Sequence, residues 1–318
     1  MITKIFPRII FMGTPEFAVP TLDILLKNNY NIVAVVTAPD KPAGRGLKLS
    51  MSPVKEFALQ HQLKVLQPTN LKDPEFIQLL QELQPDLQIV VAFRMLPEVV
   101  WNLPPLGTYN LHASLLPKYR GAAPINFAII NGEKITGVTT FKIQREIDTG
   151  HIALQQSIEI TPTDTAGTLH DKLKIIGAEL MLKTVQFIEK NELTLQAQDD
   201  SEVCYAPKIT KEFCHINWNQ PSEKIYNFIR GLSPYPGAYT FYPANDKKIL
   251  WKILFGNIIQ QASQSAPGTI VSDNKKYIQV ATQDGYISIT QIQAEGKKAM
   301  NVEEFLRGNK VESGKVLV

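Results

Sequence analysis

The chain contains 318 residues, of which 44% are hydrophobic and 20% charged, and its formal net charge at pH 7 is +3. This is the composition of an ordinary globular protein, and the charge is too small to force a nucleic-acid-binding interpretation. The charge is uneven: residues 209–318 hold 13 Lys and Arg against 9 Asp and Glu, or +4, whereas residues 1–208 hold 20 against 21, or −1. The length favours two domains, and the second is the basic one.

We expect neither a membrane segment nor a disulfide framework. No apolar run approaches the roughly 20 residues needed to cross a bilayer, and residues 1–8 lack the apolar core and cleavage site of a signal peptide. The cysteines, Cys204 and Cys214, show no metal-ligand spacing, and we expect reduced, partly buried thiols. The sequence therefore predicts a cytoplasmic protein that binds no membrane and no metal.

Short apolar runs alternate with amphipathic stretches over residues 8–195. The first run is a strand that ends at Gly13, and Pro15 then fits the first turn of a helix. Further strands are expected at 31–37, 64–66, 86–93, 107–112 and 138–141, and helices at 52–62, 73–83 and 165–190. This alternation predicts an α/β fold with a doubly wound, Rossmann-like, mostly parallel sheet.

The rest of the chain has a different pattern. Residues 196–211 are polar and irregular, which indicates a linker between a domain at 1–195 and a domain at 212–318. After a helix near 221–231, Pro and Gly separate β-like runs at 237–242, 248–254, 268–271, 277–282 and 286–292. Such spacing predicts a small C-terminal β-barrel, similar to an OB fold.

Polar residues gather at the expected strand ends. Asn110 and His112 lie two residues apart at the end of one strand, so their side chains point to the same face. Gly13 and the turn at Phe93 also fall at strand ends, where ligands bind in open sheets. A histidine at a strand end is more often a structural hydrogen-bonder, and the local residues leave that role and catalysis equally open.

The motif Asp148-Thr149-Gly150 follows the strand at 138–141. Taken alone, its aspartate is best interpreted as a turn former. Brought beside Asn110 and His112, it completes a set in which the amide and imidazole hold an oxyanion and the carboxylate orients the imidazole or handles protons. No serine or cysteine nucleophile accompanies this set, which suits direct transfer of a small acyl group between two bound substrates.

Two glycine-containing segments are weaker signals. Residues 13–16 lack the G-x-G-x-x-G pattern, so a nicotinamide cofactor is not expected. The basic, glycine-rich stretch 41–48 is ordinarily a solvated loop, but Lys41, Arg45 and Lys48 can also neutralise RNA phosphates.

Several stretches together resemble the methionyl-tRNA formyltransferase family, which uses 10-formyltetrahydrofolate. They are residues 10–17, 39–46, 52–55, 110–123, 148–150, 266–270 and 296–300. The resemblance implies transfer of a formyl group from 10-formyltetrahydrofolate, as co-substrate, to the α-amino group of methionyl initiator tRNA, in the initiation of protein synthesis. It also implies a catalytic domain at 1–195, a tRNA-binding barrel at 212–318 and a monomeric protein.

The resemblance assigns roles residue by residue. Asn110, His112 and Asp148 match the catalytic positions of the family, and Arg45 matches an arginine on the loop that reaches the tRNA acceptor end. The folate-binding segment is matched by Ser114, Leu115, Leu116 and Pro117.

Two segments depart from the family pattern. Arg94 stands where a glycine is common, within the shortened stretch 91–97, and Gln144-Arg145-Glu146 precedes Asp148 where Asp-x-Gly is frequent. Both segments border the pterin pocket that the resemblance implies.

Other functions are still compatible with the sequence. The same catalytic set serves formyl transfer to an aminosugar nucleotide or a purine precursor, and it serves a hydrolase that releases formate from formyltetrahydrofolate. A non-catalytic RNA-binding module is a third alternative, although it gives no reason for the pairing of Asn110 with His112.

Overall fold

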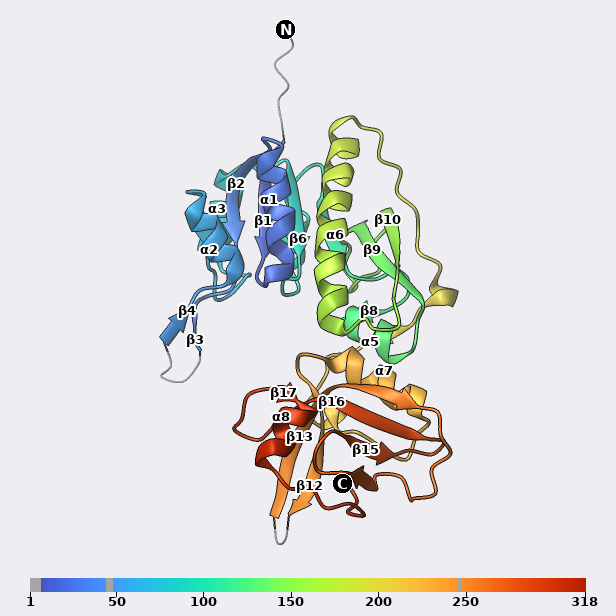
Figure 1. Cartoon of the computed structure of the whole chain (residues 1–318). Coiled ribbons are helices and arrows are strands. Elements are labelled where there is room, and N and C mark those ends of the chain that lie inside the picture. The colour runs from blue at the N-terminus through green and yellow to red at the C-terminus, as the bar shows by residue number, and fades with distance from the viewer. Residues whose placement is uncertain (1–6, 44–47, 245–246) are drawn as a thin grey trace. The chain divides into compact units, whose positions relative to one another are not determined.

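The structure is a computed structural model that describes residues 7–43, 48–244 and 247–318 (Figure 1). Contacts divide the chain into two compact units. The first unit comprises Met1–Gly121, Thr136–Ile158 and His170–Tyr205, and the second comprises Ala122–Ile135, Glu159–Leu169 and Ala206–Val318. Within the described ranges, no helix is both long and apolar enough to cross a membrane.

The first unit contains a seven-stranded sheet with the order β10-β9-β7-β6-β1-β2-β5. Its parallel part is formed by β1 (Arg8–Gly13), β2 (Asn31–Val36), β5 (Val65–Leu66), β6 (Leu87–Val91) and β7 (Thr108–His112). β9 (Ile135–Lys142) runs antiparallel to β7, and β10 (Ile152–Glu159) lies at the edge. The predicted doubly wound, mostly parallel sheet is confirmed.

The register brings the carboxyl ends of three strands into line. Gly13 of β1 pairs with Val91 of β6, and Val91 pairs with Leu111 of β7. His112 therefore follows one residue beyond this line, at the end of β7. The predicted convergence of strand ends, which is where open α/β sheets bind ligands, is confirmed.

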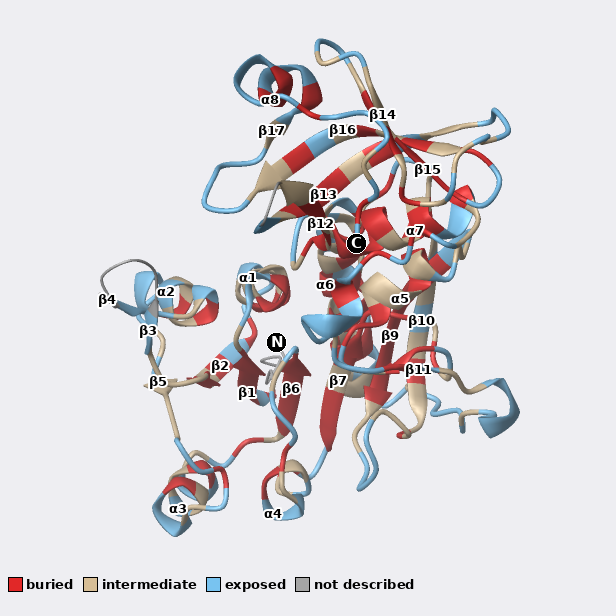
Figure 2. Ribbon diagram, turned by 90° about the horizontal axis from the view of Figure 1, so that it is seen from below, coloured by how far each residue is buried: buried red, intermediate tan, exposed pale blue. Residues whose placement is uncertain are grey.

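Helices cover both faces of this sheet (Figure 2). They are α1 (Val19–Lys27), α2 (Pro53–Gln60), α3 (Pro74–Glu82), α4 (Glu98–Trp101) and α6 (Ala166–Glu189). On one face Met12 and Val90 belong to a buried cluster with Leu80 of α3. On the other face Leu111 lies so close to α6 that a Cβ on Gly177 would be 2.8 Å from its Cδ2 atom. Burial of both faces explains why these strands are almost continuously apolar.

Side-chain caps start α2 and α3. The Ser52 hydroxyl accepts from the Lys55 amide at 3.1 Å, and the Asp73 carboxylate caps α3 in the same way. The prediction for Pro15 was wrong in detail. Its extended backbone precedes a 3-10 turn, Glu16–Ala18, and Pro20 occupies the first turn of α1 instead.

The second unit is built on an antiparallel sheet with the order β12-β13-β16-β15-β14, to which β17 adds beside β16. The strands are β12 (Ala238–Ala244), β13 (Lys247–Ile259), β14 (Ile270–Ser272), β15 (Ile278–Ala281), β16 (Tyr286–Ala294) and β17 (Met300–Asn301). The helices are α5 (Pro124–Ile130), α7 (Ser222–Leu232) and α8 (Val302–Gly308), together with the 3-10 turn Glu212–Cys214.

The last residues of the chain join the two edge strands of this sheet. Phe241 of β12 exchanges two backbone hydrogen bonds with Val318, at 2.8 and 3.1 Å. Ile270 of β14 donates to the Lys315 carbonyl at 2.8 Å and accepts from Gly314 at 2.8 Å. Residues 314–318 thus close the sheet on itself, which confirms the predicted small barrel.

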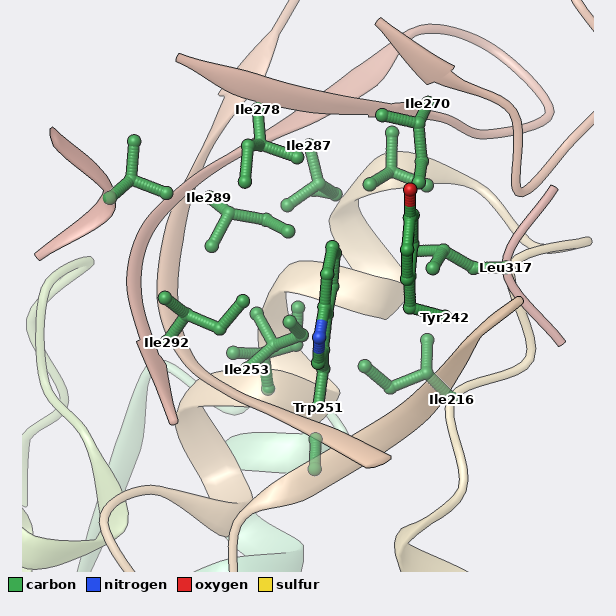
Figure 3. Close-up of a cluster of buried hydrophobic side chains, with 14 of the residues drawn as sticks. Ile216, Tyr242, Trp251, Ile253, Ile270, Ile278, Ile287, Ile289, Ile292 and Leu317 are labelled. Atoms are coloured by element: carbon green, nitrogen blue, oxygen red, sulfur yellow. The ribbon is translucent and has the colours of Figure 1, made fainter. Parts of the chain in front are cut away.

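The barrel core is aliphatic around one aromatic stack (Figure 3). The rings of Tyr242 and Trp251 are stacked at 4.5 Å with an interplanar angle of 4°, and Phe305 of α8 meets Trp251 edge-on at 5.4 Å. Fully buried isoleucines, among them Ile253 and Ile278, fill the space around the stack.

Both cysteines are free, as predicted. Cys204 is partly buried and Cys214 is buried, and burial raises the pKa of the Cys214 thiol.

Candidate active site

Asn110 presents an unengaged amide at the end of β7. Its backbone is fixed on both sides, because it pairs with Val90 of β6 and with Phe141 of β9. The side chain is partly exposed and makes no hydrogen bond with any residue that the structure describes. Pairing on both sides therefore fixes the position of this amide at the strand end.

His112 is held in one tautomer by the backbone. Its side chain is 7% exposed, and its Nε2 atom lies 2.8 Å from the Tyr119 carbonyl oxygen. Because a carbonyl oxygen only accepts, Nε2 is the donor and carries a proton. The Nδ1 atom is then the nitrogen that can exchange a proton, and it lies 3.8 Å from Oδ2 of Asp148.

Asp148 occupies a left-handed backbone conformation, with φ of 56°. Its Oδ2 atom accepts a hydrogen bond from the Gly121 amide at 2.9 Å, and its side chain is 14% exposed. Left-handed conformations cost a non-glycine residue of order 1–3 kcal/mol unless the surroundings hold them, and such residues are frequent at functional sites. The structure thus brings Asp148 beside His112, and places Asn110 on the same strand face as His112.

Gly150 completes the turn that carries Asp148. A Cβ atom there would lie 1.8 Å from the Lys142 carbonyl oxygen, closer than any real contact. Only glycine allows the turn 148–150 to press against the end of β9 in this way.

The segment Ser114–Pro117 follows β7 and is tied to the neighbouring strands. The Thr139 hydroxyl of β9 donates to the Ser114 carbonyl at 2.7 Å, and the Leu116 amide donates to the same hydroxyl oxygen at 3.1 Å. The Ser114 side chain is fully buried and donates to the Lys118 carbonyl at 2.6 Å. The serine hydroxyl is therefore used inside the turn.

Gln198 is a site residue that the sequence did not reveal. Its Nε2 atom donates to the carbonyl oxygens of Asp148 and Gly150, both at 2.8 Å. Its Oε1 atom accepts from Nε and Nη2 of Arg120, at 3.1 and 2.8 Å. A glutamine in a polar segment carries no sequence signal for such a contact.

The two segments that depart from the family pattern have local structural roles. Arg94 donates from Nη1 to the Thr69 carbonyl at 2.9 Å and from Nη2 to the Pro68 carbonyl, so it ties the loop after β6 to residues 68–69. Gln144 lies with its Nε2 atom 2.7 Å from Nδ1 of His151, which closes the base of the loop that carries Asp148.

The basic stretch 41–48 is flanked by paired strands, β3 (Lys41–Ala43) and β4 (Lys48–Ser50). Lys41 pairs with Ser50 in this hairpin and is exposed. Lys48 begins β4, whereas Arg45 lies outside the described residues. Among the residues of the described ranges, no group of three or more His, Cys, Asp or Glu is placed to hold a metal ion.

Comparison with known proteins identifies the family. Residues 7–185 match the sequence-family model of the formyl transferases, and residues 208–310 match the family model of the formyl transferase C-terminal domain. The methionyl-tRNA formyltransferase of Bacteroides thetaiotaomicron is 52% identical over 312 residues, covering 96% of this chain and 97% of that protein. This chain belongs to the methionyl-tRNA formyltransferase family.

Solved structures of related enzymes share the fold of this family. The N-formyltransferase from Helicobacter canadensis, in complex with folinic acid and dTDP-3-aminofucose, has a TM-score of 0.64 at 23% identity, covering 89% of this chain and 98% of that one. The sugar 3N-formyl transferase WlaRD, crystallised in the presence of dTDP and 5-N-formyl-THF, has a TM-score of 0.65 at 23% identity, with coverages of 92% and 100%.

Proposed function

We propose that this protein transfers the formyl group of 10-formyltetrahydrofolate to the α-amino group of methionyl initiator tRNA, for translation initiation. The observation that carries the proposal is the 52% identity to the Bacteroides thetaiotaomicron methionyl-tRNA formyltransferase over nearly the whole of both chains. The formyl-folate ligands named for the structurally similar sugar formyltransferases support a formyl-folate as the donor.

The reaction needs donors for an oxyanion. When the amine of methionyl tRNA attacks the formyl carbon, the formyl oxygen becomes negative in a tetrahedral intermediate. We assign the donors as the free amide of Asn110 and the Nδ1–H of protonated His112, because Nε2 of His112 is already used by the Tyr119 carbonyl. Each such donor typically contributes roughly 10²–10³ in rate.

Asp148 supplies the negative charge that this scheme needs. Its Oδ2 atom lies 3.8 Å from Nδ1 of His112, where it orients the imidazole ring. Its Oδ1 atom makes no hydrogen bond with a described residue and can take a proton from the attacking amine through a water. The leaving N10 of the folate takes a proton from the imidazolium, so the reaction needs no covalent enzyme intermediate and no metal.

The substrate-binding assignments extend this scheme. Residues 114–117 are proposed to bind the folate through backbone groups and the Leu115 side chain, since the Ser114 hydroxyl is buried and engaged. Lys41, Arg45 and Lys48 are proposed to contact tRNA phosphates, and for Arg45 the support is the family resemblance.

The same proposal covers the wider organisation of the protein. We place the catalytic domain at residues 1–195, the linker at 196–211 and a tRNA-binding barrel at 212–318. A monomer that works in the cytoplasm, where initiator tRNA is charged, fits this function.

The test is incubation of the protein with 10-formyltetrahydrofolate and methionyl initiator tRNA, with formyl-methionyl-tRNA as the measured product. Parallel reactions contain dTDP-3-aminofucose as acceptor, or no acceptor. Product with the tRNA alone supports the proposal. Formylation of the aminosugar nucleotide alone, or formate release without an acceptor, would replace it by the corresponding alternative.

A further inference from the structure

The polar segment at 196–204 runs beside the catalytic turn. The Gln196 backbone exchanges two hydrogen bonds with Ile152 of β10, at 2.8 and 2.9 Å. Eight residues later, the Cys204 carbonyl accepts from the Arg120 amide at 3.0 Å. The segment is therefore fixed at both ends to elements of the first unit, and Gln198 lies between the two points of attachment.

Gln198 uses both of its amide protons and its amide oxygen in one network. The side-chain amide of Gln198 donates hydrogen bonds to the carbonyl oxygens of Asp148 and Gly150. Its oxygen accepts hydrogen bonds from Nε and Nη2 of Arg120. We call these contacts the Gln198 clamp. The amide nitrogen of Gln198 binds the turn that carries Asp148, and its oxygen binds the guanidinium of Arg120.

Arg120 links this clamp to both members of the histidine–carboxylate pair. The residue before it, Tyr119, accepts the Nε2 hydrogen bond of His112, and the residue after it, Gly121, donates to Oδ2 of Asp148. The Arg120 side chain is itself only 7% exposed. Any displacement of this three-residue stretch thus moves the partners of both catalytic groups together.

The remaining partner of Arg120 is a weak anchor. Asp200 accepts from Nη2 at 2.8 Å, but its side chain is 83% exposed, and exposed ion pairs contribute little. The backbone adopts the left-handed conformation at Tyr119, just before Arg120, and again at Asp148, with φ of 62° and 56°. Such conformations persist only where surrounding contacts fix them, and the partly buried amide of Gln198 joins the Asp148 carbonyl to the side chain of Arg120, the residue after Tyr119.

We propose that Gln198 is a positioning residue for the formyl transfer: its side chain joins the turn that carries Asp148 to the buried guanidinium of Arg120. Gln198 touches no substrate. It keeps the carboxylate at its distance from the imidazole, and this role rests on the proposed function of the site.

Two substitutions separate the two ends of the clamp. Gln198→Glu keeps an acceptor for Arg120 and adds a charge that pairs with it, but it has no proton to donate to the Asp148 and Gly150 carbonyls. Gln198→Ala removes both ends. Gln196→Ala is the matched control, because Gln196 is the same residue type two positions away, with an exposed side chain.

The expected result is a loss in kcat with little change in KM. A misplacement of about 1 Å costs on the order of 10²-fold in rate, and we expect a loss of that order for both Gln198 variants, with KM for both substrates within about threefold. Gln196→Ala keeps wild-type values. If Gln198 served only to satisfy Arg120, Gln198→Glu would be nearly as active as the wild type, and that outcome overturns the proposal.

A second measurement asks whether Gln198 acts through the carboxylate. In an Asp148→Asn background, adding Gln198→Ala should lower kcat by less than about twofold, because residues that act as one unit are not additive. Losses that multiply show that Gln198 acts independently of Asp148, and the proposal is then wrong.

Amide hydrogen exchange provides a readout that does not depend on activity. The Gly121 amide is protected by Oδ2 of Asp148, so a peptide containing it should exchange faster in Gln198→Glu than in the wild type and Gln196→Ala. Unchanged exchange overturns the clamp. If the wild type and Gln196→Ala both fail to formylate methionyl tRNA, the proposed function is wrong and the exchange result alone decides whether the clamp exists.

Discussion

Replacement of Gly150 by alanine tests the geometry of the catalytic turn most directly. The new Cβ atom would lie 1.8 Å from the Lys142 carbonyl oxygen, whereas real Cβ atoms essentially never come within 3.0 Å of such a group. The turn and the end of β9 must therefore separate by about 1.2 Å, the difference between these two distances. A misplacement of roughly this size lowers rates on the order of 10²-fold, because Asp148 moves with the turn.

The assay compares kcat for formylation of methionyl tRNA by the wild type, Gly150→Ala and Gly308→Ala. Gly308, in α8 of the barrel, is the matched control, since a Cβ added there meets nothing within 4 Å. Circular dichroism and thermal unfolding of all three proteins verify that the fold is kept. A folded Gly150→Ala enzyme with kcat within about twofold of the wild type would refute the tight turn and, with it, the placement of Asp148 beside His112.

Three further predictions concern stability, pH and the tRNA. Trp251→Ala removes the central ring of the barrel core and should lower the free energy of unfolding by about 3–5 kcal/mol in a denaturant titration; a loss below about 1 kcal/mol would contradict that packing. Burial, followed by the neighbouring Glu189 carboxylate, raises the pKa of Tyr30 to about 12. The raised pKa stabilises the folded protein fully below pH 10, the pKa of a free tyrosine, and this stabilisation is lost as the pH rises through about 12. Tyr30→Phe should therefore lose free energy of unfolding less steeply with rising pH than the wild type does. Equal slopes of this free energy against pH would contradict the prediction. Arg45→Ala should raise KM for methionyl tRNA while KM for the folate stays unchanged. If the kinetics with tRNA do not change, the 41–48 loop is a solvated connection that does not bind tRNA.

The local elements of the first unit could be predicted because their signals are local. Ser52 and Asp73 cap the helices that follow them, and the apolar strands around Ile10 and Ile89 are buried on both faces, so their composition alone identifies them. Strand β10 was missed, since it lies at the sheet edge and partly buried residues alternate with exposed polar ones along it. Helix α8 was missed for a similar reason: it is seven residues long and its apolar face is completed by the barrel.

Contacts between residues far apart in the chain could not be predicted from the sequence. The barrel closes through Val318, which bonds to Phe241 seventy-seven positions earlier, and strand pairing at that separation leaves no periodic trace. The approach of His112 to Asp148 is similar, since these residues meet only because β9 turns back beside β7. Their roles came from the resemblance to a family, and their chemistry from the residue types.

The sequence by itself determined the alternating fold, the family and the three polar groups, because periodicity, capping and motif order are properties of neighbouring residues. Only the tertiary structure decided which imidazole nitrogen is available, since that depends on the Tyr119 carbonyl. It also showed that Gln198, in the segment expected to be a linker, donates to the carbonyls of Asp148 and Gly150. Hydrogen bonds of this kind depend on distance and direction in space, and composition does not encode either.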